Sequence, residues 1–174
     1  ADLRISHATV TVSAVDPEIG GRIYAWVRDG SELLRGREAG ERMWQAQAEG
    51  IRALVRRGVM VKINAILIPG VNDDHLVEVA RQVAALGAAR FNCLPLHPVP
   101  STAFGHLPEP DKLMVHGVRA LCGKHLPQME HCARCRADAI GRIGQANSTE
   151  QLLTLQRHAK VDNAAVPAVA EASL

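Results

Sequence analysis

Apolar and polar residues alternate along three stretches of the chain, and stretches with apolar residues at helical spacing lie between them. The alternation predicts strands over residues 7–13, 59–68 and 90–96. The helical spacing predicts helices over residues 41–57, 75–86 and 111–125, and a shorter helix that begins at Pro17. Strands that alternate with helices in this way are typical of βαβ units, so we expect an α/β fold with parallel strands.

Each predicted strand has an apolar face and a polar face. The polar faces carry Thr9, Thr11 and Ser13, then Lys62 and Asn64, then Arg90 and Asn92. Parallel strands covered by helices on both faces are normally apolar on both. The pattern therefore favours a partial or complete barrel with a polar interior that holds a ligand; the alternative is an open sheet with one face in water. Burial of Lys62 without a partner is costly, so we expect either a carboxylate or ligand there or an internal salt bridge.

Glycine, proline and aspartate residues set the boundaries of the first predicted helix. It begins at Asp16-Pro17, and its apolar residues continue until Asp29-Gly30-Ser31 breaks it. Residues 32–40 are charged and contain two glycines, so we expect a loop with a marginal helical turn.

Later turns and loops follow the same rules. Asp73 and Asp74 are most simply explained as caps of the next helix. The Pro- and Gly-rich loop at residues 97–110 is long enough to cover a site. Beyond it we expect a short helix that opens at Ser148 and a disordered tail at residues 164–174.

Cys132 and Cys135 form a Cys-x-x-Cys pair with arginines beside it. The spacing lets both thiolates bind one zinc ion or iron–sulfur cluster, and the neighbouring positive charge favours the thiolate form. Two cysteines complete neither kind of site, so the pair borrows further ligands, is redox-active or consists of buried thiols. His131 is equally a metal ligand or a hydrogen-bond partner.

The other two cysteines fall on apolar faces and are interpreted as core residues. Cys93 follows Asn92 on the third strand and so points to the helix side with Phe91. Cys122 belongs to the apolar positions of the last predicted helix, which are Met114, Val118, Leu121 and Cys122.

Composition narrows the class of protein. Aromatic residues make up only 3% of the chain, so the core must consist of Val, Ile, Leu and Ala. A net charge of +2 gives no reason to expect nucleic acid or a membrane surface as a partner. The chain has no recognisable signal peptide and no long apolar run, so the cytoplasm is the expected location. It begins Ala-Asp-Leu without a methionine, so we expect a fragment.

Four blocks of the chain resemble consecutive blocks of the NifB family, radical S-adenosylmethionine (SAM) proteins of nitrogenase cofactor biosynthesis. The blocks are TVTVSAVDPEIG from Thr9, KINAILIPGVND from Lys62, NCLPL from Asn92 and HCARCRADAIG from His131. The resemblance covers roughly residues 1–141 and implies the second half of a partial (β/α)6 barrel. It also implies [4Fe–4S] clusters and SAM as cofactors, and a reaction that fuses two clusters with a SAM-derived carbide into an eight-iron precursor.

The resemblance also implies domains and site residues. It places the barrel at residues 1–126 and a cluster-binding segment at 127–145, and the short helix and tail expected from the residues themselves make up 146–174. The implied cluster ligands are Cys132 and Cys135, and the strand residues implied to line the SAM pocket are Ser13, Lys62, Asn64, Asn92 and Leu94. It assigns no catalytic residue. The implied partners are iron–sulfur cluster donors and carrier or scaffold proteins of the nitrogenase cofactor.

The chain departs from the family pattern in one decisive respect. No cysteine precedes Cys93, so the Cys-x-x-x-Cys-x-x-Cys signature is absent, and the chain alone should not cleave SAM. After Gly141 the residues also differ from the acidic end usual in the family. The alternatives are a non-catalytic zinc or iron–sulfur module at His131, Cys132 and Cys135 and a thiol–disulfide protein. The second fits poorly, because the pair follows a helix instead of opening one.

Overall fold

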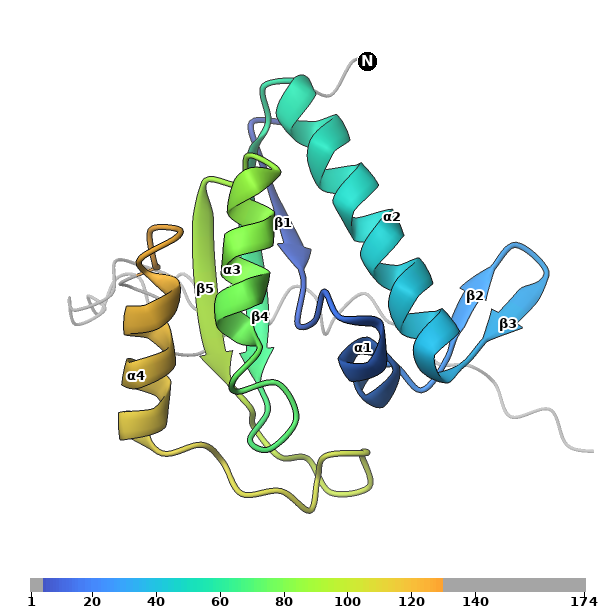
Figure 1. Ribbon diagram of the computed structural model, residues 1–174, viewed down its shortest axis with the longest axis vertical. Coiled ribbons are helices and arrows are strands. Elements are labelled where there is room, and N and C mark those ends of the chain that lie inside the picture. The colour runs from blue at the N-terminus through green and yellow to red at the C-terminus, as the bar shows by residue number, and fades with distance from the viewer. Residues whose placement is uncertain (1–4, 130–174) are drawn as a thin grey trace, which may run out of the picture. The chain divides into compact units, whose positions relative to one another are not determined.

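Three parallel strands form the central sheet in the computed structural model, which describes residues 5–129. The strands are β1 (His7–Thr11), β4 (Met60–Leu67) and β5 (Arg90–Pro95), in the order β1-β4-β5 (Figure 1). All three predicted strands are therefore confirmed, and so are the α/β class and the parallel direction. The order follows from two consecutive β-helix-β crossovers, which parallel pairing requires.

The register of the sheet aligns the polar residues into rows. Thr9 pairs with Lys62, and Lys62 pairs with Arg90 on the third strand. One step further along, Thr11 pairs with Asn64, and Asn64 pairs with Asn92. Because side chains alternate across a strand, every residue of these two rows lies on one face of the sheet.

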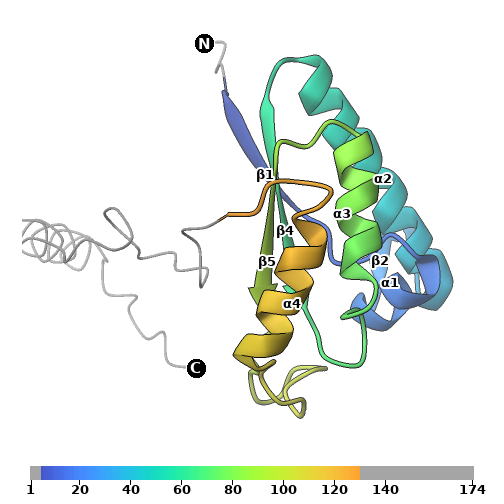
Figure 2. The same ribbon diagram turned by 60° about the vertical axis from the view of Figure 1, so that its left-hand side comes forward.

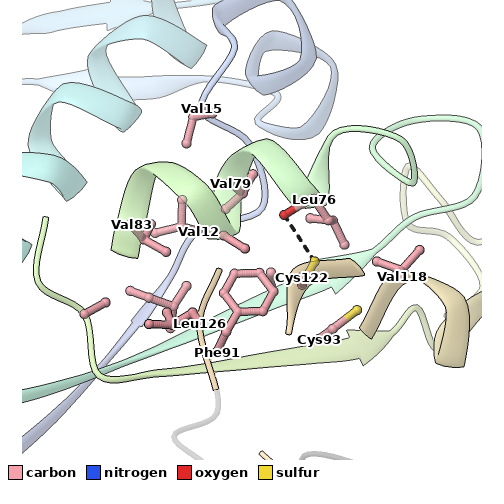
Figure 3. Close-up of a cluster of buried hydrophobic side chains, with 14 of the residues drawn as sticks. Val12, Val15, Leu76, Val79, Val83, Phe91, Cys93, Val118, Cys122 and Leu126 are labelled. Carbon is pink, nitrogen blue, oxygen red and sulfur yellow. Dashed lines mark hydrogen bonds between the residues drawn. The ribbon is translucent and has the colours of Figure 1, made fainter. Parts of the chain in front are cut away.

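The other face of the sheet is covered by three helices. Figure 2 shows α2 (Gly36–Arg56), α3 (Leu76–Ala85) and α4 (Lys112–Cys122) on the same side of the strands. Figure 3 shows part of the core between them. Its fully buried members include Ile51, Val61, Ile63, Leu67, Leu76, Val79, Val83 and Phe91. The core consists mainly of Val, Ile, Leu and Ala, as the composition predicts, with Phe91 as its largest side chain.

A short helix and a hairpin follow β1. Helix α1 (Pro17–Ile23) begins as predicted, since the Asp16 carboxylate accepts hydrogen bonds from the Glu18 and Ile19 N–H groups. It ends at Ile23, however, earlier than predicted. Strands β2 (Val27–Asp29) and β3 (Glu32–Leu34) then pair as an antiparallel hairpin. The two-residue turn is Gly30-Ser31, with glycine at its first position and a φ of 59° there, as a tight hairpin turn favours, and the prediction of a helix break missed it.

Helix α2 begins at Gly36, whereas a loop was predicted for residues 32–40. The two glycines that suggested a loop belong to the helix, and the backbones of both lie close to α1. A Cβ on Gly40 would lie 2.7 Å from the Gly21 N atom and would overlap the Pro17 carbonyl oxygen. A Cβ on Gly20 would lie 2.8 Å from the Cα of Gly40. The backbones of α1 and α2 thus approach so closely that only glycine fits.

The predictions for the last two helices are partly wrong. Asp73 and Asp74 do not cap α3; its N-cap is His75, which makes no side-chain capping bond. On α4, Met114 and Leu121 are 36% and 46% exposed, because the helix turns Val115, Val118 and Cys122 toward the sheet instead. Cys93 and Cys122 are fully buried in the core, as predicted.

The described residues form an open sheet of three strands, and no helix of residues 5–129 covers its polar face. No helix in this range is long and apolar enough to cross a bilayer. The predictions for Cys132, Cys135, the helix at Ser148 and the tail at 164–174 lie outside the described residues.

Candidate functional site

The centre of the polar face is a pair of asparagines on neighbouring strands. The Asn92 amide donates to the Asn64 side-chain oxygen over 3.1 Å. Asn92 is only 2% exposed, and the other end of its amide, Oδ1, has no hydrogen-bond partner among the described residues. A buried polar group without a partner costs about 1–3 kcal/mol. This face therefore presents an unused hydrogen-bonding group at the place where a ligand is predicted.

A positively charged row precedes the asparagines. Lys62 is half-buried in the register between Thr9 and Arg90. Within residues 5–129, no carboxylate lies within ion-pair distance of Lys62, so the predicted internal salt bridge is not formed there. Two cationic side chains side by side without a carboxylate favour an anionic ligand group.

An apolar row follows the asparagines. Leu94 is buried and pairs in register with the half-buried Ile66. Successive rows are about 7 Å apart, because each strand residue adds about 3.3 Å and side chains alternate. From one end of the strands to the other, the polar face thus presents a row of cations, a row of amides and an apolar row. Such a face can bind an elongated ligand with an anionic end, hydrogen-bonding groups and a flat apolar part.

Ser13 lies where β1 leaves the sheet. The last backbone bond of β1 to β4 runs from the Val12 N–H to the Asn64 carbonyl over 2.8 Å. The Ser13 hydroxyl then accepts a hydrogen bond from the Ile66 N–H over 3.1 Å, so that a side chain continues the pairing. A hydroxyl can donate while it accepts, so Ser13 can also donate to a ligand. The structure therefore brings Ser13, Asn64, Asn92 and Leu94 to one end of the same face, with Lys62 one row earlier.

Sequence reasoning missed two side chains next to this end of the sheet. Asn72 is 1% exposed, and its amide binds the backbone of three residues, Ser13, Ile66 and Ile68. His75 Nε2 accepts hydrogen bonds from the Val15 and Asp16 N–H groups over 3.1 and 3.2 Å. A polar residue in a tight turn between a buried strand and a helix was the available signal, because such residues bind local backbone.

The two core cysteines lie on the helix-covered side of the sheet, away from the polar face. Burial raises the pKa of the Cys93 thiol to about 11 and the pKa of the Cys122 thiol to about 12. The Cys122 Sγ lies 3.4 Å from the Leu76 carbonyl oxygen, to which it donates (Figure 3). Both groups are therefore protonated thiols near neutral pH in the core.

The predicted cluster ligands lie just beyond the described residues. Within residues 5–129, no three His, Cys, Asp or Glu side chains are arranged to hold a metal ion. The described part of the chain ends along the outer edge of β5: the Phe91 N–H donates to the Pro127 carbonyl, and the Met129 N–H donates to the Phe91 carbonyl, each over 2.9 Å. Roles for His131, Cys132 and Cys135 stay predictions.

Comparison with known proteins finds close relatives of one kind. The chain is 51% identical over 155 residues to the FeMo cofactor biosynthesis protein NifB of Chlorobaculum tepidum, covering 89% of this chain and 37% of that protein. It is 45% identical to NifB of Klebsiella pneumoniae, covering 86% and 33%, and 37% identical to NifB of Azotobacter vinelandii, covering 91% and 32%. No family model matches the chain. The chain spans about a third of the length of these curated relatives.

Proposed function

The chain belongs to the NifB family over the residues that it shares with these relatives, and from this premise we propose that it forms the SAM-binding side of a radical SAM barrel in a protein of FeMo cofactor biosynthesis. The observation that carries the proposal is the buried Asn92 amide, one end of which has no partner within residues 5–129, on the polar face of a parallel sheet.

The three rows of the polar face fit the parts of SAM. SAM has a carboxylate, an ammonium group, ribose hydroxyls and a flat adenine ring. Lys62 and Arg90 suit the carboxylate. The free Asn92 Oδ1 can accept from a ribose hydroxyl or the ammonium group, and the Ser13 hydroxyl can donate to a ribose oxygen or a ring nitrogen. The row of Ile66 and Leu94 suits the apolar face of adenine. When bound, SAM supplies the one-carbon unit that becomes the carbide of the eight-iron product.

The edge of β1 supports a larger barrel. In the described residues β1 pairs on one side only, with β4, so its other edge is free. The outer edge of β5 is instead occupied by residues 127–129. Parallel strands rarely leave a face and an edge in water. We therefore propose that further strands of the barrel pair with β1 and enclose the polar face.

Cys132 and Cys135 are proposed as ligands of the clusters that are fused, which are substrates of the reaction. Thiolates are the usual ligands of iron–sulfur clusters, and two of them require further ligands from elsewhere. Donors of iron–sulfur clusters and carrier proteins for the product are the proposed partners.

A chimera tests the proposal. The 155 matched residues of the C. tepidum protein are replaced by those of this chain, and the purified chimera is tested anaerobically for SAM binding. Restoration of nitrogenase activity is measured in extracts that lack NifB. We expect the chimera to bind SAM and to restore nitrogenase activity. Asn92→Leu should weaken SAM binding roughly tenfold, because it removes about one hydrogen bond to SAM. A folded chimera that binds no SAM would contradict the proposal.

Iron and sulfide analysis tests the cysteine pair in the same chimera. The Cys132→Ala/Cys135→Ala variant should lose part of the bound iron and sulfide, whereas Cys122→Ala, which removes a core thiol, should keep it. Stoichiometric zinc without sulfide at this pair would instead support a zinc-binding module.

A further inference from the structure

We propose that Asn72 and His75 are positioning residues that hold the segment from Ser13 to Asp16 against β4, so that Ser13 stays aligned with the polar face. Both belong to the turn between β4 and α3. The role of Ser13 toward SAM rests on the proposed function. The clamp on residues 13–16 rests only on the hydrogen bonds to the backbone.

The segment needs a clamp because it has left the sheet. Its last backbone bond to β4 is the one from the Val12 N–H. The segment then runs buried from Ser13 to Val15 before α1 begins at Pro17. Buried backbone groups without partners are costly, so side chains must supply the missing bonds.

Asn72 joins the ends of both strands. Its Nδ2 group donates to the Ser13 carbonyl over 2.9 Å and to the Ile66 carbonyl over 2.8 Å. Its Oδ1 atom accepts from the Ile68 N–H over 2.8 Å. Together with the bond from the Ile66 N–H to the Ser13 hydroxyl, these contacts fix both the backbone and the side chain of Ser13.

His75 holds the next two residues. Its Nε2 atom accepts from two consecutive backbone N–H groups, those of Val15 and Asp16, and an imidazole nitrogen can accept only when it carries no hydrogen. The ring must therefore be neutral with its hydrogen on Nδ1. A proton on Nε2 would place an N–H group against two N–H groups and break both bonds.

Solvent can reach the ring, so its protonation state can change with pH. The ring lines a cavity of about 350 Å³, together with Val15, Asp16, Pro17, Ile19, Glu78 and Gln82. Burial lowers the pKa of His75 below its ordinary value of 6.5, while the carboxylates of Asp16 and Glu78 act in the opposite direction. Each carboxylate is engaged elsewhere, Asp16 by the amides at the start of α1 and Glu78 by Arg81 and Gln82.

Hydrogen exchange of the 174-residue chain tests the clamp without SAM. In His75→Ala the amides of Val15 and Asp16 should exchange at least tenfold faster near neutral pH. His75→Gln provides an amide oxygen as acceptor and should restore slow exchange. His116→Ala, which removes an exposed histidine from α4, is the matched control. Unchanged exchange in His75→Ala would overturn the clamp.

A pH series covers the case in which His75→Ala does not fold. In the unmutated chain, exchange at Val15 and Asp16, corrected for its intrinsic pH dependence, should accelerate below the pKa of His75. The His75→Gln variant should show no such acceleration, because glutamine does not titrate. Identical pH profiles for the two proteins would overturn the proposal.

SAM affinity of the chimera tests the positioning of Ser13. At a temperature at which all variants are folded, His75→Ala should raise the dissociation constant about tenfold, and His75→Gln less than threefold. In a Ser13→Ala background the effect of His75→Ala should shrink, since both changes act through one contact. Full additivity, or unchanged affinity, would overturn the positioning role. Absence of SAM binding in the unmutated chimera would contradict the proposed function. The hydrogen-exchange rates of Val15 and Asp16 would still test the clamp independently.

Discussion

The two faces of the central sheet differ in whether their side chains find packing, hydrogen-bond and ion-pair partners within the described residues. On the helix-covered face, Val61, Ile63 and Phe91 are fully buried against α2, α3 and α4. On the polar face, the amide of Asn92 is half used and Lys62 has no carboxylate in the described residues. The first face therefore determines stability, and the second has the unused binding capacity of a site. This difference can be tested by substitutions on each side.

The largest expected effect is on the apolar face. Phe91→Ala removes the largest fully buried side chain and should lower the free energy of unfolding by about 3–5 kcal/mol. Urea unfolding followed by circular dichroism measures it. Leu113→Ala is the control, since Leu113 is 83% exposed and its loss should stay within about 0.5 kcal/mol. Similar losses at the two positions would show that the core is placed wrongly.

Glycine substitutions on α2 sharpen the account of the helix layer. Gly40→Ala should destabilise the protein by about 1–3 kcal/mol, because its Cβ would overlap the backbone of α1. Gly50→Ala, on the same helix with open space around it, should instead stabilise by about 0.5–1 kcal/mol. Thermal unfolding of the pair compares them directly. Stabilisation by both alanines would contradict the close approach of α1 and α2.

On the polar face a comparable change should leave stability nearly intact. Asn92→Leu loses one bond to Asn64 but also removes a buried group with an unpartnered end. These effects oppose each other, so the net change should lie within about 1 kcal/mol. Urea unfolding measures the stability, and SAM affinity of the chimera measures the binding. If Asn92→Leu lowered the free energy of unfolding as much as Phe91→Ala does, the polar face would contribute to stability like the apolar face, against this account.

The smallest expected effect is a pH dependence from His75. The pKa of His75 is lowered in the folded protein, so the unfolded chain binds a proton more readily as pH falls below 6.5. Stability should therefore rise with pH from about 5 to about 7.5, and His75→Gln should flatten part of this rise. The pKa of Glu78 is lowered to about 2 by bonds from Arg81 and Gln82, so its contribution is lost only at lower pH. Parallel pH curves for the two proteins would contradict the role of His75.

Most of the sheet could be predicted from the sequence because alternation is a local signal. β4 differs from its predicted span by only one residue at each end. Cys93 was assigned to the core because it follows Asn92 on the strand and so points to the opposite face of the sheet. The beginning of α2 could not be predicted in this way. Gly36 and Gly40 both resemble helix breakers locally. Gly40 is required by a contact with α1 that only the folded chain shows, whereas Gly36 has a φ of 52°, which favours glycine.

The candidate site was predictable in its residues but not in its bonds. Thr11, Asn64 and Asn92 were expected on one face, and the register aligns them in one row. The roles of Asn72 and His75 depend on a turn that brings residues about sixty positions apart into contact, which no local pattern contains. Asp73 and Asp74 attracted the prediction instead, since acidic residues before a helix commonly cap it.

The two edges of the sheet have a consequence for self-association. Along the outer edge of β5, Phe91 pairs with residues 127–129, the Cys93 carbonyl accepts two bonds from Arg119, and Pro95 has no N–H group. Of the three strands of the central sheet, only β1 has a free edge in the described residues. Two copies that join there by a twofold axis leave no further free edge in their joined sheet. Association of the described sheet alone, without the strands proposed to pair with β1, would therefore stop at a dimer and would not extend into a fibre.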